Sequence, residues 1–225
     1  MMHDGKALQS GTSHYFGDGF ARAFDISFTD ADNTQKTPFE TSWGMSTRII
    51  GAIIMVHGDD SGLVLPPRIA PVQVVIVPAQ QHKEGVLEKA TWLRDRLSGA
   101  FSVKLDDSDR MPGWKFAEYE MRGVPLRIEI GPRDIEKGQC VLVRRDNREK
   151  IFVSLDGIEE AVAKTLEDIQ QSLYQNALKR REERMYEAYD LETLKQTAQQ
   201  KPGFITAPWC GSLECELRLK DEAGV

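Results

Sequence analysis

Apolar residues in the middle of the chain follow two periods, one typical of strands and one typical of helices. The run from Val72 to Pro78 is almost continuously apolar, as in a strand buried on both faces. Apolar positions from 86 to 97 then follow helical spacing, and Gly99 provides a stop. Alternating positions at 101–105 and 126–130 predict two half-buried strands with a short helix between them.

The same alternation continues beyond these strands. Apolar runs at 140–143 and 151–155 predict two more strands, which a charged turn separates. The apolar spacing at 158–173 predicts a helix, and Asp156 with Glu159 resembles a capping pair at its start. Because strands alternate with helices throughout, this stretch predicts a compact α/β domain.

The end of the chain predicts a small third unit. The charged segment KRREERMYEAYD, from Lys179, is expected to continue the preceding helix in solvent. The segment DLETLKQTAQQKPG, from Asp190, predicts another helix that ends at Pro202 and Gly203. We therefore expect a small α/β unit after the compact domain.

The first third of the chain has weaker periodicity, as expected of loops around a site. Phe24, Ile26 and Phe28 alternate like a strand. The run from Ile49 to Val56 is apolar on every side, so we expect it to be buried, and neither its length nor Gly51 decides between helix and strand.

A proline cluster follows this apolar run. Because each proline fixes its own φ and restricts the residue before it, Pro66, Pro67 and Pro71 predict a stiff crossing between domains. The chain of 225 residues is long enough for one large domain or two modest ones. The domains that we expect are 1–70, 71–174 and 175–225.

Composition excludes several classes of function. The chain is 40% hydrophobic and 28% charged, which is typical of a soluble globular protein. No apolar stretch approaches the about 20 residues of a membrane helix, and the polar start lacks the layout of a secretory signal. A cytoplasmic location follows. A net charge of -6 argues against indiscriminate nucleic-acid binding, so any RNA contact should be local.

The segment from Thr41 to Pro71 carries candidate phosphate chemistry. Arg48 offers a planar, permanently charged fork that suits phosphate oxygens, and Gly44 allows a close backbone approach. The alternative for Arg48 is a surface ion pair. The later string HGDD could supply metal ligands or acid/base groups at His57, Asp59 and Asp60, but we favour a polar turn. The sequence contains no P-loop string and no nucleophilic triad.

Two strings, ALQSGTSHYFG from Ala7 and WGMSTRIIG from Trp43, resemble the amino-acid pocket and third signature motif of class II prolyl-tRNA synthetases of the eukaryote-like and archaeal-like group. The resemblance implies a partial catalytic domain, with a strand near 39–43 followed by a helix. It implies ATP with Mg²⁺ and proline as substrates. The implied ATP ligands are Gln9, Thr12, Ser46 and Arg48, of which Arg48 is also catalytic. The implied proline ligands are His14, Trp43 and Gly44, with Thr12 beside them.

The first two signature motifs of that family do not occur in this sequence. We therefore expect a segment of a larger enzyme, inactive alone in forming prolyl-adenylate, whose parent is a homodimer. The rival hypothesis is a non-catalytic, tRNA-binding accessory protein derived from a synthetase. The retained pocket residues argue against this rival, because an RNA adaptor has no use for an ATP pocket.

Residues 72–173 resemble the anticodon-binding domain shared by class II synthetases for histidine, glycine, threonine and proline. The string from Pro112 to Asp146 is close to the prolyl version. The resemblance implies that Phe116 stacks near the anticodon, that Glu120 accepts from a guanine edge and that Arg133 donates to guanine acceptors. A core phenylalanine and a solvated ion pair are the alternatives.

One hairpin turn of this domain is rich in positive charge. Such a cluster is often only a solvated turn, but it is the best candidate for contact with the tRNA(Pro) phosphate backbone. Its residues are Arg144, Arg145, Arg148 and Lys150.

The chain has three cysteines, and this odd number gives no disulfide framework. Cys210 and Cys215, in WCGSLEC, match half of a zinc site in the C-terminal domain of the family. A structural Zn²⁺ site takes four ligands, so free thiols or a weakly occupied site are expected here. Cys140 lies in an apolar run and is expected to be a small buried residue.

Overall fold

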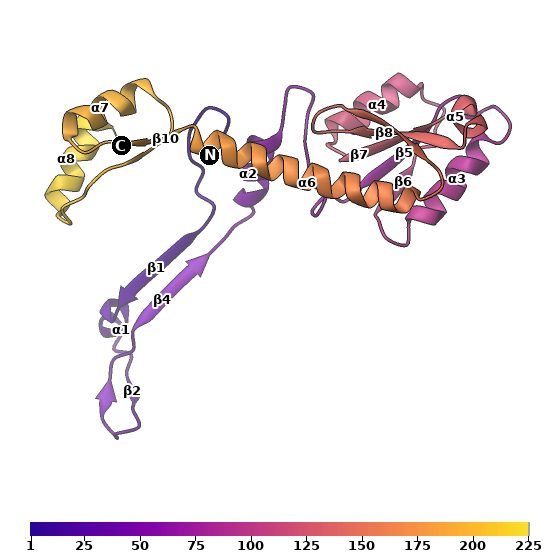
Figure 1. Ribbon diagram of the computed structural model, residues 1–225. Coiled ribbons are helices and arrows are strands. Elements are labelled where there is room, and N and C mark those ends of the chain that lie inside the picture. The colour runs from indigo at the N-terminus through magenta and orange to yellow at the C-terminus, as the bar shows by residue number, and fades with distance from the viewer. Residues whose placement is uncertain (225) are drawn as a thin grey trace. The chain divides into compact units, whose positions relative to one another are not determined.

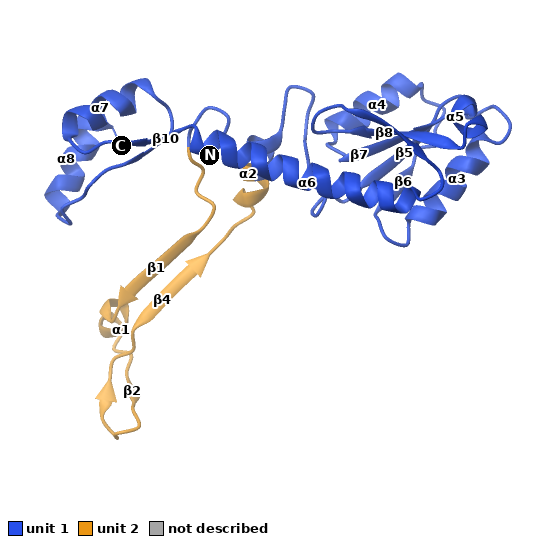
Figure 2. Cartoon of the chain, in the orientation of Figure 1, with its two compact units in different colours: residues 1–6, 53–225 blue, residues 7–52 orange. Residues whose placement is uncertain are grey.

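The computed structural model describes residues 1–224. They form two compact units: residues 7–52 make one, and residues 1–6 with the chain from 53 onward make the other (Figure 2). The fold is mixed α/β, as predicted. None of the helices in the described residues combines the length and the apolar character that a membrane crossing requires.

The larger unit contains a five-stranded mixed sheet (Figure 1). Its order is β6-β5-β7-β8-β9, with β5 parallel to β6 and β7 and the other pairs antiparallel. The inner strand β5, between β6 and β7, is buried at every residue, which explains its continuous apolar sequence. The strands are β5 (Val74–Pro78), β6 (Val103–Leu105), β7 (Leu126–Ile130), β8 (Gln139–Arg144) and β9 (Lys150–Ser154).

Helices cover both faces of this sheet. Val74 and Ile76 belong to a core with α3 (Val86–Leu97) and α6 (Ile158–Glu182). Val75 and Val77 instead pack against α4 (Pro112–Met121). Since successive strand residues point to opposite faces, α4 lies on the face opposite to α3 and α6. The short helix α5 (Pro132–Glu136) follows β7.

A buried polar group fixes α4 against the sheet. Lys115 is 1% exposed, and its Nζ donates to the Asp106 carbonyl at 2.8 Å and lies 3.4 Å from the Asp106 carboxylate. Burial, and then a hydrogen bond with Asp106, raises the pKa of Tyr119 to about 12. Lys115 and Tyr119 directly precede Phe116 and Glu120, so these anchors set the rotation of the helix that carries both.

The end of the chain forms two helices and a small sheet. Asp190 caps α7 by accepting from the Thr193 amide at 2.8 Å, and Ser212 caps α8 by accepting from the Cys215 amide at 3.2 Å. Strands β10 and β11 pair in parallel. The elements are β10 (Met185–Glu187), α7 (Leu191–Gln200), β11 (Phe204–Thr206) and α8 (Leu213–Ala223).

The smaller unit consists mainly of two strand pairs. Strands β1 and β4 are antiparallel, with Thr12 opposite Gly44 and His14 opposite Ser42. Strands β2 and β3 form a second antiparallel pair. The elements are β1 (Thr12–Gly17), α1 (Gly19–Ala23), β2 (Phe28–Thr29), β3 (Gln35–Lys36) and β4 (Glu40–Gly44), and α2 (Arg48–His57) begins in this unit.

The structure corrects four predictions about these elements. The run from Ile49 to Val56 is helical, but the burial prediction was wrong, since none of the α2 residues is buried and Ile50 is 58% exposed. The predicted strand at 24–28 is wrong, because Phe24 ends α1 and only Phe28 enters a strand. The charged segment from Lys179 was predicted to continue the preceding helix. That prediction was wrong beyond Glu182, where α6 ends, because the chain then forms strand β10.

The fourth correction concerns the start of α6. Its N-cap is Gly157, with φ of 76°, and no side chain caps the helix. Glu159 pairs instead with Arg96 of α3. The capping prediction was wrong because a long-range ion pair engages the glutamate that the local pattern assigned to the cap.

Candidate functional site

A pocket of about 380 Å³ lies within the smaller unit. Pairing of β1 with β4 brings its two walls together, although they are about 30 residues apart in sequence. All seven residues predicted to bind ATP or proline line this one pocket: Gln9, Thr12, His14, Trp43, Gly44, Ser46 and Arg48. Their individual roles stay predictions.

Hydrogen bonds connect the polar side chains of this pocket. Arg48 Nη1 donates to Gln9 Oε1 at 2.9 Å, and Gln9 Nε2 donates to Thr12 Oγ1 at 2.8 Å. The Arg48 amide donates to Ser46 Oγ at 3.4 Å. An arginine has five side-chain donors, and within residues 1–224 only Gln9 accepts from this one. The remaining donors of Arg48 are therefore available to an anionic ligand.

Trp43 and Met45 give the pocket its large apolar side chains, and His14 adds an imidazole ring. Trp43 is 80% exposed, so its indole can form the wall of a small apolar site. His14 stacks on Phe16 with centroids 5.1 Å apart and planes at 14°, which fixes the orientation of its ring. One cation, several hydroxyls and an indole suit a ligand that combines a phosphate with a small apolar ring.

A second candidate site lies on the α4 side of the five-stranded sheet. Phe116 and Glu120 are four residues apart on α4 and therefore share a helix face. Phe116 is half-buried against the β5 core, and the Arg127 guanidinium carbon lies 4.2 Å from its ring centroid. The sequence analysis missed Arg127, although it is one of the two polar positions that alternate with apolar residues in β7.

Charged and aromatic side chains continue across the same sheet face. The register pairs Val143 with both Arg127 and Lys150, and Val141 with both Glu129 and Phe152. Directly opposed residues point to the same face. Arg127 pairs with Glu129 at 2.9 Å, and Phe152 is 66% exposed. An exposed ring beside cations is suited to stacking with nucleic-acid bases.

Arg133 lies apart from this group. It is exposed at the start of α5 and lines a different cavity, of about 510 Å³, at the carboxyl ends of β5 and β7. Lys83 and Gln80 line the same cavity. The structure thus brings Phe116 and Glu120 together, and it puts Arg133 in a separate cavity of the same domain.

The basic turn contains two kinds of arginine. Arg144 and Arg145 are 8% and 3% exposed, and they pair with Asp146 at 2.7 Å and with Asp59 at 2.6 Å. Arg148 and Lys150 each have side chains 58% exposed. A phosphate could reach the buried guanidinium of Arg144 or Arg145 only by displacing its carboxylate partner, so we propose no phosphate contact through them.

The ion pair between Asp59 and Arg145 predicts a specific pH dependence. Hydrogen bonds from Arg145 lower the pKa of Asp59 from 3.8 to about 2. The pKa of Asp59 is lower in the folded protein than in the unfolded chain. The ionised carboxylate therefore stabilises the fold above about pH 4, and this contribution disappears as the pH falls through about 2. Replacing Asp59 by asparagine should therefore lower the unfolding free energy at pH 7, with a difference from wild type that shrinks toward pH 2. Urea titrations at several pH values measure this; a pH-independent difference would contradict it.

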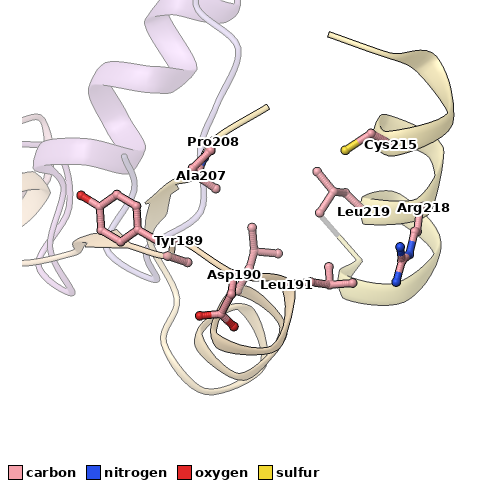
Figure 3. Close-up of a pocket in the computed structure, with 10 residues that line it drawn as sticks. Tyr189, Asp190, Leu191, Ala207, Pro208, Cys215, Arg218 and Leu219 are labelled. Carbon is pink, nitrogen blue, oxygen red and sulfur yellow. The ribbon is translucent and has the colours of Figure 1, made fainter. Parts of the chain in front are cut away.

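The cysteine pair lies at the start of α8. Cys215 lines a pocket of about 180 Å³, and Figure 3 shows its sulfur turned from the helix toward that pocket. Cys210 Sγ lies 3.4 Å from Ser212 Oγ, and hydrogen bonding with Ser212 lowers the pKa of Cys210. Within residues 1–224, no third metal-binding side chain joins these thiols. The two alone do not complete a tetrahedral Zn²⁺ site.

The third cysteine was predicted correctly. Cys140 is fully buried in β8 and packs in the sheet core with Leu142 and Ile128. Burial raises the pKa of its thiol to about 12, so it stays protonated at neutral pH. It is a small apolar core residue with no role in either candidate site.

Comparisons with known proteins cover the residues of both candidate sites. Residues 73–165 match the anticodon binding domain family. The chain is 65% identical over 224 residues to the proline–tRNA ligase of Ruminiclostridium cellulolyticum and 60% identical over 225 residues to that of Clostridium novyi. Each alignment covers 100% of this chain and 47% of the relative. Over its whole length the chain is therefore similar to these proline–tRNA ligases, and it spans about half of their length.

Proposed function

We propose that the chain is part of a proline–tRNA ligase, which activates proline with ATP and transfers it to tRNA(Pro). One observation carries the proposal: Arg48, Gln9 and Trp43 line one pocket, and the Arg48 guanidinium is hydrogen-bonded to Gln9 across 39 residues of sequence. The proposed domains are the C-terminal part of a class II catalytic domain at 1–70, an anticodon-binding domain at 71–174 and a partial C-terminal domain at 175–225.

The activation step assigns a task to each part of the pocket. The proline carboxylate attacks the α-phosphorus of ATP, pyrophosphate leaves, and negative charge builds on the phosphoryl oxygens. Arg48 stabilises that charge, because a fixed cation is worth most where charge develops. Gln9, Thr12 and Ser46 bind the remainder of ATP. The pyrrolidine ring lies against Trp43, beside His14 and Gly44.

Mg²⁺ enters this scheme with its nucleotide. The ion prefers oxygen ligands and usually binds through substrate phosphates with one or two carboxylates. No carboxylate is among the described residues that line the pocket. We therefore assign Mg²⁺ to the ATP phosphates and to ligands other than these residues.

The second site would read the anticodon. A prolyl anticodon contains two adjacent guanines, and single-stranded bases are recognised by stacking and by hydrogen bonds to their edges. Phe116 supplies the stacking surface and Glu120 the acceptor for a guanine edge. Arg133, from its separate cavity in the same domain, supplies the donor, and the exposed Arg148 and Lys150 contact phosphates.

The rival function is that of a non-catalytic, tRNA-binding accessory protein. The hydrogen-bonded Arg48 argues against it, since stacking and base reading need no such pocket. The proposal also includes a homodimeric, cytoplasmic parent enzyme, on the strength of the family resemblance. Zinc in its C-terminal domain would need two ligands in addition to Cys210 and Cys215.

Proline-dependent exchange of pyrophosphate into ATP tests the proposal. A protein of the relatives' length that carries this segment should catalyse the exchange with proline and not with alanine. Binding of tRNA(Pro) without any exchange would favour the accessory protein. Failure of both activities would contradict the proposed function.

A further inference from the structure

The polar turn after α2, residues 58–62, has no task in the proposed function, yet one of its carboxylates contacts the anticodon-binding domain. Asp59 accepts two hydrogen bonds from Arg145, from Nη2 to Oδ1 at 2.6 Å and from Nη1 to Oδ2 at 2.8 Å. The Arg145 side chain is only 2% exposed, whereas that of Asp59 is 41% exposed. This bidentate geometry is the strongest form of arginine–carboxylate pair.

The third donor of Arg145 points at the helix that carries the anticodon residues. Its Nε donates to the backbone carbonyl of Glu120 at 2.8 Å. Glu120 lies in the last turn of α4, and its carbonyl also accepts from the Gly123 amide at 3.0 Å, so the guanidinium joins the backbone hydrogen bonds that end the helix. One buried guanidinium therefore connects the Asp59 carboxylate directly to the backbone of the proposed guanine acceptor.

Backbone contacts hold the same two segments together. The Leu63 amide donates to the Met121 carbonyl at 3.0 Å, and the Leu65 amide donates to the Gly123 carbonyl at 3.3 Å. Gly62 has φ of +130°, and a Cβ there would lie 2.5 Å from the Met121 backbone. Only glycine allows this approach, so the turn lies directly against the end of α4.

The turn also supports a cation beside the Glu120 side chain. Arg148 donates through Nη2 to the Ser61 hydroxyl. Its Nε lies 3.8 Å from Glu120 Oε1. The turn therefore contacts Glu120 indirectly in two ways. Arg145 connects Asp59 to the Glu120 carbonyl, and Arg148 connects Ser61 to the Glu120 carboxylate.

We propose that Asp59 is a positioning residue for anticodon recognition: its pair with Arg145 fixes the last turn of α4 and so sets where the Glu120 carboxylate meets a guanine edge. This inference rests on the proposed function of Glu120. Removing the carboxylate leaves a buried guanidinium without its partner, an arrangement that proteins relieve by moving the groups around it. The group bonded to that guanidinium is the backbone of Glu120.

The test uses the full chain and two RNA hairpins, one with two adjacent guanines in its loop and one with both replaced by adenine. Asp59→Asn should reduce the ratio of the two affinities about 5-fold or more, in the range of ordinary coupling between sites. Asp59→Glu restores the charge and should recover part of the ratio. Asp60→Asn is the matched control, because Asp60 is exposed in the same turn and takes no part in the ion pair between Asp59 and Arg145. An unchanged ratio in a folded Asp59→Asn protein overturns the proposal.

A double substitution separates positioning from general loosening of the fold. If Asp59 acts through Glu120, then Asp59→Asn combined with Glu120→Gln should discriminate no worse than Glu120→Gln alone. If the double substitution instead lowers discrimination by the product of the two single effects, Asp59 acts independently of Glu120, which contradicts the proposal. If Glu120→Gln by itself keeps full discrimination, the proposed role of Glu120 fails. If Glu120→Gln loses discrimination while Asp59→Asn keeps it, only the positioning role fails.

Discussion

Replacing Arg48 by lysine is expected to slow proline-dependent ATP–pyrophosphate exchange by about 10²–10³-fold, the usual cost of removing one preorganised donor from a charged transition state. Lysine keeps the positive charge but loses the planar guanidinium. In the wild-type protein this guanidinium donates to Gln9 at 2.9 Å and has further donors for phosphate oxygens. The loss should fall mainly on kcat, because the charge develops during the reaction. The assay uses a ligase of the relatives' length.

Arg22→Lys is the matched control for this substitution. Arg22 belongs to the same unit, pairs with Asp18 at 2.6 Å and does not line the pocket. The control should leave the exchange rate unchanged. A normal exchange rate in the Arg48→Lys enzyme would remove Arg48 from the reaction and leave the pocket without a phosphate ligand.

Replacing Glu120 by glutamine is expected to reduce discrimination for the anticodon guanines about 10- to 100-fold, since a good edge contact is worth about 1–3 kcal/mol. A carboxylate accepts from the adjacent N–H donors of guanine, whereas an amide presents one acceptor and one donor group. The measurement is the ratio of dissociation constants for tRNA(Pro) and for tRNA(Pro) with one anticodon guanine replaced.

Glu118→Gln provides the comparison on the same helix. Glu118 pairs with Arg122 at 2.5 Å, so it is already occupied by a neighbour one turn away. Its substitution should change the discrimination ratio little. Equal effects of the two substitutions would mean that charge on α4, rather than Glu120 itself, determines the preference.

The core of the larger unit could be predicted because local pattern and burial agree there. The apolar run at β5 is buried on both faces, and the helical spacing in α3 matches Val86, Ala90, Leu93 and Leu97, which are all buried. In such segments the side chains that set the period are the same ones that pack. The five strands and the helices α3, α4 and α6 therefore lie where the sequence predicts them, whereas the short helix α5 was not predicted.

Contacts between distant segments could not be predicted in the same way. Arg145 and Asp59 are 86 residues apart, and no local pattern distinguishes the buried Arg145 from the exposed Arg148. The position of Arg127 over Phe116 likewise depends on how α4 packs on β7. The burial expected for α2 failed for a related reason, because an apolar sequence does not determine which segment packs against it. Exposed residues such as Ile50 mark an apolar surface of the kind that other protein segments cover.

Direct binding of tRNA(Pro) by the full chain tests the central claim, that this stretch carries the anticodon-reading part of a proline–tRNA ligase. Dissociation constants would be measured at one salt concentration for tRNA(Pro) and for the same tRNA with both anticodon guanines changed to adenine. The account predicts at least about 10-fold weaker binding of the changed tRNA, because each wrong base costs about 1–3 kcal/mol. Equal affinities for the two RNAs would contradict it.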